Sequence, residues 1–315
     1  MPLKLVPDNT NIGFVKLRFI AFALTLALTI GAGALLAVRG LNLGVDFVGG
    51  LTMQVEFSAP PPLDALRERV NQVGVGDSAL QEFGKPTTIL IRLPLPEGDQ
   101  AAVQRVVGKV RTALEKDYPG VNFSRVESVS GKVSQELITD GLWAVGLSML
   151  FVAVFTWFRF EWYFGVSTVV ALVHDVVVTL GFFSLTQLEF DLNIVAAVLT
   201  IIGYSLNDKV VIDDRIRENL RKYRQMDIRQ IIDLSVNETL PRTVMTSVTL
   251  LAALIALLLL GPEVIFGFTA AMVLGIVVGT YSSIFVSSSL LISLGVKPGP
   301  TTVDDKRASG AERVK

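Results

Sequence analysis

The sequence contains no cysteine and only one histidine, His174. Without cysteine the chain forms neither disulfides nor thiolate metal sites, and one histidine is too few for the usual zinc site. The HExxH, GxSxG and P-loop motifs of metalloproteases, serine hydrolases and nucleotide-binding proteins are also missing. We therefore expect no cofactor, no metal site and no enzymatic activity.

Charged residues are scarce as well, at 18% of the 315 residues, while 51% are hydrophobic. Soluble domains average about 25% charged residues. The mean hydropathy of +0.55 is correspondingly high. The formal net charge is −1, and the charges are concentrated in a few segments. This composition predicts a membrane protein, for which we expect no nucleic-acid partner.

Apolar runs account for the hydropathy. A membrane-spanning helix needs roughly 20 mostly apolar residues. The first run is longer than the apolar core of a typical signal peptide, so we interpret it as an uncleaved anchor. The sequence thus predicts a polytopic α-helical membrane protein with six transmembrane helices, at residues 19–38, 138–158, 163–186, 192–212, 243–260 and 264–294.

Lysine and arginine in short connections predict the orientation, because they are enriched on the cytoplasmic side. They occur in the N-terminal segment 1–18, at Arg159 and throughout the connection 213–242. The alternate short connections are acidic, with Glu189 and Asp191 in one and Glu263 in the other. We therefore expect both termini to be cytoplasmic, with 213–242 as a cytoplasmic loop, 132–296 as a five-helix membrane region and 297–315 as a disordered cytoplasmic tail.

One polar segment, residues 39–131, separates the first two spans and is expected on the periplasmic side. It alternates strand-like patterns with two amphipathic helical patterns, in the order β-α-β-β-α-β. This order is typical of a split βαβ, ferredoxin-like α+β domain. It shows no nucleotide-binding loop and no acidic metal cluster, so a docking or force-transmitting role is the simplest interpretation.

Charged residues inside the predicted spans are costly, by about 2.5–3.5 kcal/mol each, and call for an explanation. His174 and Asp175 lie in the middle of the third span, and Asp208 lies in the fourth. Arg242 begins the fifth span at a depth similar to that of Asp208. A pair between Asp208 and Arg242 that switches when the carboxyl gains or loses a proton would be suited to proton-coupled work.

Structural explanations of the same residues stay open. Asp208 and Arg242 could form a static ion pair, and His174 could be a polar contact between helices and not a proton relay. Lys209 adjoins Asp208, but neighbouring helical residues do not face each other, so we expect its side chain to snorkel to the cytoplasmic surface. Asp175 and Asp208 do not lie in the sequence context of an intramembrane aspartyl protease.

Small residues recur every fourth position in the last span. Because small side chains let helices approach closely, we interpret the stripe as a packing seam. Its members are Ala271, Gly275, Gly279, Ser283 and Ser287.

Three sequence blocks resemble the SecF members of the SecD/SecF family, in the resistance-nodulation-division superfamily. The blocks are GVDFVGG at 44–50, IVAAVLTIIGYSLNDKVVIDDRIREN at 194–219 and NETLPRTVMTS at 237–247. With the glycines of the sixth span, the resemblance covers about residues 14–296. The motif positions that we carry over are Gly44, Asp46, Phe47, Gly49, Gly50, Asn207, Asp214 and Arg215.

The resemblance implies a location in the bacterial inner membrane and a role in protein export. It implies SecD, the SecYEG channel, YajC, translocating preproteins and protons as partners, with late export steps driven by the proton-motive force. It also implies that Asp208 and Arg242 take part in proton movement. Lys209 and Asp213 depart from the usual pattern, in which threonine and an apolar or aromatic residue are frequent.

Two alternatives follow from the residues. A proton-driven exporter of small molecules or lipids from the same superfamily would carry a second large insertion between the fourth and fifth spans, or a fused second half, and neither lies within this chain. A purely structural scaffold would tolerate loss of the Asp208 charge. We also expect Gly44, Gly49 and Gly50 to permit a tight connection between the first span and the inserted domain, and their placement gives the hypothesis of a hinge there.

Overall fold

The computed structural model describes residue 7 and residues 10–96 and 100–297. Most of the expected tail 297–315, and the N-terminal segment apart from residues 7 and 10–18, lie outside the described residues. The chain divides into two compact units. The membrane unit comprises Met1–Asn42, Trp143–Leu188 and Asn193–Lys315, and the α+β unit comprises Leu43–Leu142 and Glu189–Leu192.

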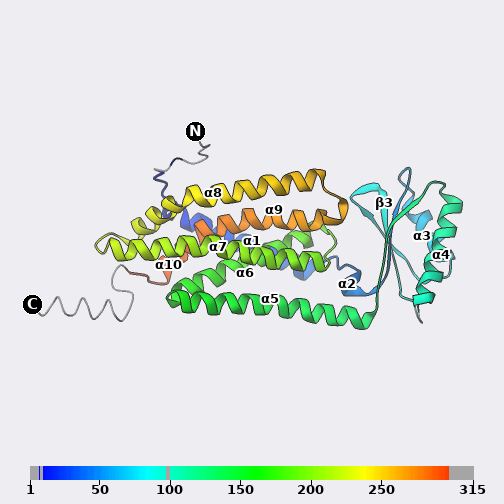
Figure 1. Cartoon of the computed structure of the whole chain (residues 1–315), viewed down its shortest axis with the longest axis horizontal. Helices are drawn as coiled ribbons and strands as arrows, with labels where there is room; N and C mark the ends of the chain where they lie inside the picture. Colours follow the sequence, from blue (N-terminus) through cyan, green and yellow to red (C-terminus); the bar gives the residue numbers. More distant parts are fainter. Residues whose placement is uncertain (1–6, 8–9, 97–99, 298–315) are drawn as a thin grey trace, which may run out of the picture. The chain divides into compact units, whose positions relative to one another are not determined.

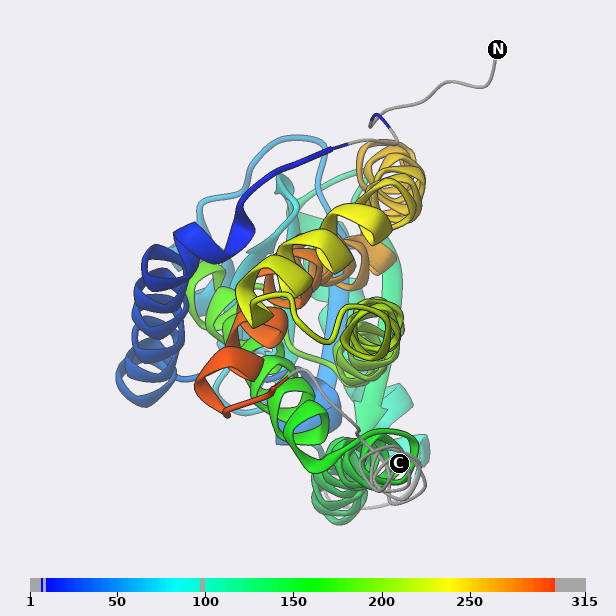
Figure 2. The ribbon, with the colours of Figure 1, turned by 90° about the vertical axis from the view of Figure 1, so that its left-hand side faces the viewer.

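Six helical segments in the described part of the chain are long and apolar enough to cross a membrane, which confirms the expected spans. Figure 2 views them nearly end-on. The most apolar window of α6 is 56% buried within the protein, against 6% for that of α5, so α6 is a central helix and α5 a peripheral one. The segments are α1 (Arg18–Arg39), α5 (Gly131–Arg159), α6 (Trp162–Thr186), α7 (Leu192–Lys222), α8 (Ile228–Leu260) and a sixth from Glu263 to Ser293 (Figure 1).

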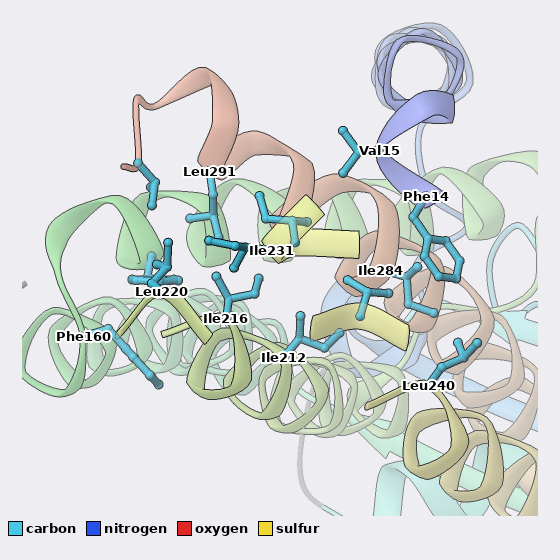
Figure 3. Packing of buried hydrophobic residues seen from close by; sticks show 14 residues of the cluster. Phe14, Val15, Phe160, Ile212, Ile216, Leu220, Ile231, Leu240, Ile284 and Leu291 are labelled. Atoms are coloured by element: carbon cyan, nitrogen blue, oxygen red, sulfur yellow. The ribbon is translucent and has the colours of Figure 1, made fainter. Parts of the chain in front are cut away.

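The expected loop at 213–242 is wrong. Helix α7 continues to Lys222, and α8 already begins at Ile228, where the Asp227 side chain accepts a hydrogen bond from the Arg229 amide at 2.7 Å. Apolar residues placed one turn apart explain both extensions, because they pack against each other in one buried cluster (Figure 3). The hydropathy pattern hid these turns because basic residues separate the apolar ones. The cluster includes Ile212, Ile216, Leu220, Ile231 and Leu240.

The sixth span is interrupted near its end. It consists of the short turn η2 (Glu263–Ile265), α9 (Phe266–Tyr281), the π-helical segment η3 (Ser282–Ser287) and α10 (Ser288–Ser293). Such π-helical segments are rare in proteins, and those that occur often lie at functional sites. Ser282, the first residue of this segment, is therefore a candidate functional residue.

The small-residue stripe of this span is a packing seam, as expected. A Cβ atom on Gly275 would lie 2.4 Å from Cδ1 of Ile201, and one on Gly279 would lie 3.0 Å from Oγ of Ser205. Both neighbours belong to α7, so the missing side chains allow α9 and α7 to approach closely.

The α+β unit is a four-stranded antiparallel sheet with two helices on its apolar side. Strand β1 pairs with β3 and β4, and β2 pairs with β3, which gives the order β2-β3-β1-β4. Leu51, Met53 and Val55 alternate along β1 and belong to the apolar core, and the residues between them, Thr52 and Gln54, are also buried, so β1 is covered on both faces. The elements are α2 (Val45–Val48), β1 (Gly50–Glu56), α3 (Leu63–Gln72), β2 (Ala79–Phe83), β3 (Lys85–Leu93), α4 (Gln100–Asp117) and β4 (Asn122–Val129).

The boundaries of this unit differ from the expected 39–131. It extends into the first turns of α5, to Leu142, because α5 is continuous with the end of the sheet domain. It also includes residues 189–192, which connect α6 to α7 and lie far away in the sequence. Sequence patterns do not predict that residues 189–192 belong to this unit, because its main segment ends about 47 residues earlier in the chain, at Leu142.

Candidate intramembrane charge cluster

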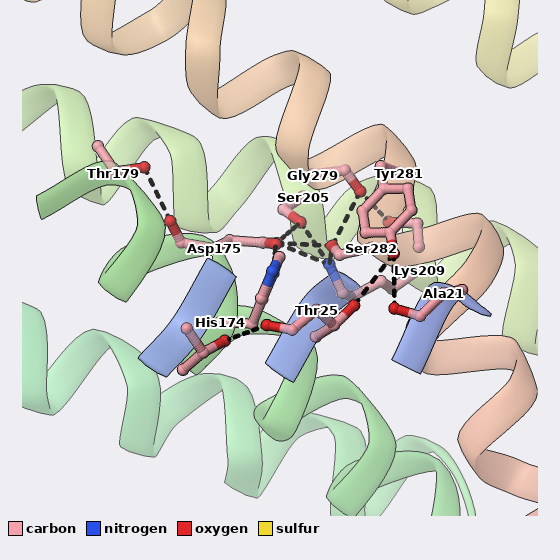
Figure 4. A network of polar contacts seen from close by, with 12 residues as sticks. Ala21, Thr25, His174, Asp175, Thr179, Ser205, Lys209, Gly279, Tyr281 and Ser282 are labelled. Atoms are coloured by element: carbon pink, nitrogen blue, oxygen red, sulfur yellow. Dashed lines mark hydrogen bonds and ion pairs between the residues drawn. The ribbon is translucent and has the colours of Figure 1, made fainter. Parts of the chain in front are cut away.

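A buried ion pair joins α6 to α7. The Lys209 ammonium donates a hydrogen bond to Oδ2 of Asp175 at 3.0 Å (Figure 4). The Lys209 side chain is 0% exposed and that of Asp175 is 1% exposed. The expectation that Lys209 snorkels to the surface is therefore wrong. A carboxylate one helix away compensates its charge, so the long side chain gains nothing by reaching water.

Two serines complete the cluster. Oδ2 of Asp175 also accepts hydrogen bonds from Ser205 of α7 at 2.6 Å and from Ser282 of η3 at 2.9 Å. Lys209 donates to the Ser282 hydroxyl at 3.0 Å and to that of Ser205. Side chains from two helical segments, α7 and η3, thus converge on one carboxylate oxygen of α6, and the π-helical segment begins at Ser282.

His174 approaches the other carboxylate oxygen. Its Nδ1 lies 3.1 Å from Oδ1 of Asp175, while its Nε2 is buried and has no hydrogen-bond partner in the described part of the chain. The centroid of its imidazole ring lies 6.4 Å from the centroid of the Tyr281 ring. The Tyr281 hydroxyl donates to the Ala21 carbonyl at 2.9 Å and lies 3.1 Å from the Thr25 hydroxyl, so polar contacts continue to α1 (Figure 4).

Asp208 has a different environment. The residue is 4% exposed, and its Oδ2 has no hydrogen-bond partner among the described residues. Arg242 lies on α8 and is exposed. Among the ion pairs between described residues, none joins these two side chains, so the structure does not bring Asp208 and Arg242 into direct contact. A buried carboxylate oxygen without a partner is costly and marks a group whose protonation state can matter.

Asp213 is a further buried acid, one turn beyond Lys209. Oδ2 accepts a hydrogen bond from the Thr168 hydroxyl of α6 at 3.3 Å, and Oδ1 has no partner. The sequence marked Asp213 only as a departure from the family pattern. The sequence pattern does not predict the burial of Asp213, because it places this residue at the start of the expected loop 213–242.

The remaining motif residues lie elsewhere. Asn207 and Asp214 are on exposed faces of α7, and Asp214 pairs with Arg159 at 2.8 Å. Arg215 pairs with Glu218 at 2.6 Å and with Glu238 at 2.7 Å. The Arg159–Asp214 pair joins α5 to α7 and the Arg215–Glu238 pair joins α7 to α8, while Arg215–Glu218 lies within α7. Solvent-accessible pairs of this kind each contribute at most about 1 kcal/mol.

The segment 44–50 belongs to the α+β unit. Oδ2 of Asp46 accepts a hydrogen bond from the Leu192 amide at 3.0 Å, and the Phe47 and Phe190 rings are 5.9 Å apart. Gly49 and Gly50 have φ values of 75° and 118°, and a Cβ on Gly50 would lie 2.7 Å from the Leu93 carbonyl oxygen. Only glycine suits this close turn into β1.

The cluster supports charge compensation and proton binding inside the membrane. In all, α6 and α7 carry one buried lysine and three buried acids, Asp175, Asp208 and Asp213. Within the described residues, no group of three or more His, Cys, Asp or Glu side chains is arranged to hold a metal ion. Ionisable groups buried in a span are typical of ion pathways and proton relays.

Six candidate spans, an α+β unit that follows the first, and buried charged residues define a polytopic membrane protein. Residues 109–297 match the family described as "Protein export membrane protein SecD/SecF, C-terminal", and residues 34–61 match the "SecD/SecF GG Motif". The chain belongs to the SecD/SecF family, whose members are subunits of the Sec protein translocase in the bacterial inner membrane.

Curated relatives agree over nearly the full length. The "Protein translocase subunit SecF" of Cereibacter sphaeroides is 41% identical, with 96% of each chain covered. The protein of that name from Rhodobacter capsulatus is 42% identical, with 93% of this chain and 92% of the relative covered. Among solved structures, SecDF from Thermus thermophilus is 32% identical with a TM-score of 0.83 over 93% of this chain. The chain spans 40% of the length of that SecDF chain.

Proposed function

We propose that this chain works with SecD as an accessory subunit of the Sec translocase, and that it couples the proton-motive force to late steps of preprotein export. The family assignment supports the export role. The observation that supports proton coupling is the Asp208 carboxylate, which is buried within a span and has one oxygen that no described residue contacts by a hydrogen bond. A proton arriving there would remove a charge that is costly in this environment.

In this proposal Asp208 is the titrating group and Arg242 is its counter-charge. The two side chains are not in contact, so each change in the Asp208 charge alters their attraction across the gap between α7 and α8. Such a change in attraction can bias one helix arrangement over another. His174 and Asp175 take a supporting role, because three polar side chains hold Asp175 Oδ2 in place.

The proposed topology follows from the basic residues, which the positive-inside rule assigns to the cytoplasm. Both termini are cytoplasmic, and the α+β unit is periplasmic. We assign this unit to the ferredoxin-like class because of its β-α-β-β-α-β order and its sheet order β2-β3-β1-β4. The proposed partners in the membrane are SecD, the SecYEG channel and YajC, with translocating preproteins outside it.

The test is export into inverted membrane vesicles, measured with and without a proton-motive force. Asp208→Asn keeps the side-chain shape and removes the charge. We expect it to abolish the stimulation by the proton-motive force while leaving co-purification with SecD intact. Asp140→Asn is the matched control, because Asp140 is an exposed acid on α5. Undiminished stimulation in Asp208→Asn would support the scaffold alternative and overturn proton coupling.

A further inference from the structure

The connection between α6 and α7 is attached to the motif that follows the first span. Phe190 forms a parallel β-bridge with Leu43, and its carbonyl accepts a hydrogen bond from the Gly44 amide at 2.8 Å. The Phe190 ring also packs against Phe47. Residues 189–192, called the strap below, therefore belong to the α+β unit, although they lead directly into α7.

Asp46 holds the far end of the strap. Its Oδ2 accepts a hydrogen bond from the amide of Leu192, the first residue of α7. The first amides of a helix have no partner within the helix, and a carboxylate at this position satisfies one of them and interacts favourably with the helix dipole. Asp46 thus performs for α7 the task of a capping residue, although it lies 146 positions away in the chain.

Arg92 holds the near end. This residue of β3 forms an ion pair with Glu189 at 3.1 Å, and the two side chains are only 24% and 18% exposed. Little space remains around the strap. A Cβ on Gly44 would lie 3.1 Å from Oε1 of Glu189 and 3.3 Å from Cβ of Asp191. The glycine at position 44 therefore allows the strap to lie against the backbone of the motif.

We propose that the strap ties the first residue of α7 to the α+β unit, and that Asp46 and Arg92 are positioning residues for proton-driven export. This inference rests on the proposed function, because α7 is the helix that carries Asp208. The chain continues without interruption from Leu192 to Asp208. A displacement of α7 that accompanies proton binding is transmitted to the sheet through the strap. This requires that the hydrogen bond from Leu192 to Asp46 and the ion pair between Glu189 and Arg92 stay formed.

Asp46→Ala tests one tie. The variant loses the acceptor for the Leu192 amide, whereas Asp46→Asn keeps an amide oxygen there. Loss of a cap costs about 1 kcal/mol, which corresponds to a factor of about five. We expect Asp46→Ala to reduce the stimulation of export by the proton-motive force about fivefold, and Asp46→Asn to restore most of it. Asp64→Ala, an exposed acid of α3, is the matched control.

Rigidity is tested by closing the strap covalently. The chain has no cysteine, so Leu43→Cys with Phe190→Cys gives a single possible disulfide. Paired strands lie about 4.8 Å apart, within the range that a disulfide can bridge. We expect the oxidised and reduced forms of this variant to show equal stimulation. A loss on oxidation would show that the strap has to open, and would overturn the proposal.

All variants are compared per molecule of membrane-inserted, SecD-bound protein, with wild type and Asp208→Asn in parallel. If wild type shows no stimulation, the proposed function itself fails. If wild type responds and Asp208→Asn does not, but Asp46→Ala and Arg92→Gln match wild type, only the strap inference fails. An equal loss in Asp46→Ala and Asp46→Asn would also contradict it, because the hydrogen bond to Leu192 would then not be the relevant contact.

Discussion

Lys209 and Asp175 form an ion pair between α7 and α6, with 3.0 Å between Nζ and Oδ2 and with both side chains almost fully buried. A buried cation beside Asp208 would by itself be the natural counter-charge for that acid. Its hydrogen bonds are instead directed to Asp175, Ser205 and Ser282. The pairing leaves Asp208 and Asp213 as buried acids of α7 with no ion pair among the described residues, whereas Asp175 is paired with Lys209.

Removing Lys209 alone should be strongly destabilising. Lys209→Met leaves Asp175 as a buried charge without its cation, and breaking such pairs costs about 3–5 kcal/mol. The double variant Asp175→Asn with Lys209→Met removes both charges, and asparagine still offers hydrogen bonds to Ser205 and Ser282. We expect it to recover most of the lost stability, measured by thermal unfolding of the purified protein in detergent.

An export assay of these variants distinguishes a static ion pair between Asp175 and Lys209 from a pair that exchanges protons. The double variant should retain stimulation by the proton-motive force, since we assign proton exchange to Asp208. Full stability together with lost stimulation would show that Asp175 or Lys209 exchanges protons. The single variant Asp175→Asn, with its unpaired lysine, serves as the second arm of the cycle and should be about as unstable as Lys209→Met.

The sequence predicted the features that depend on local patterns. Apolar runs predicted six spans, and the alternation of apolar and polar residues predicted the strands of the α+β unit. Both signals depend only on residues that are close together in the sequence. It could not predict the partner of Lys209, which lies 34 positions away on another helix. The strap was beyond sequence reasoning for the same reason, since Asp46 and Leu192 meet only in the folded chain.

The seam between α9 and α7 gives a packing prediction. Gly275→Ala places a Cβ 2.4 Å from Cδ1 of the Ile201 side chain, so the helices must separate or Ile201 must change rotamer. Overpacking of this kind typically costs about 1–3 kcal/mol. Gly203→Ala on α7 is the matched control, because apart from the adjoining helix backbone no atom of the described residues lies within 4 Å of its added Cβ. Equal unfolding temperatures for the two variants would refute the close contact.

Glu189 of the strap gives a prediction for pH. Burial raises the pKa of its carboxyl, with Asp191 and Glu127 adding to the rise and with Arg92 and Arg125 opposing it. A raised pKa means that the folded protein takes up the proton at higher pH than the unfolded chain does. Folding stability therefore increases as the pH falls from above the raised pKa to the ordinary value of glutamate.

Glu189→Gln removes this titration. The unfolding temperature of wild type should rise relative to that of Glu189→Gln as the pH is lowered from neutrality toward the ordinary glutamate range. The measurement is a pH series of thermal unfolding on both purified proteins. A relative fall would mean that the attraction of Arg92 outweighs the cost of burial, and that the pKa of Glu189 is lowered in the protein.

The contact between Thr168 and Asp213 gives the last prediction. The Thr168 hydroxyl is the hydrogen-bond donor to this buried carboxyl group, whose Oδ1 has no partner. Thr168→Val keeps the side-chain shape but removes the donor, which should cost about 1–3 kcal/mol because a buried acceptor loses its partner. Thr168→Ser keeps the hydroxyl and should be closer to wild type in thermal unfolding. In an Asp213→Leu background the penalty of Thr168→Val should disappear, since no acceptor is then left unsatisfied. A penalty that persists there would instead reflect the packing of α6 against α7.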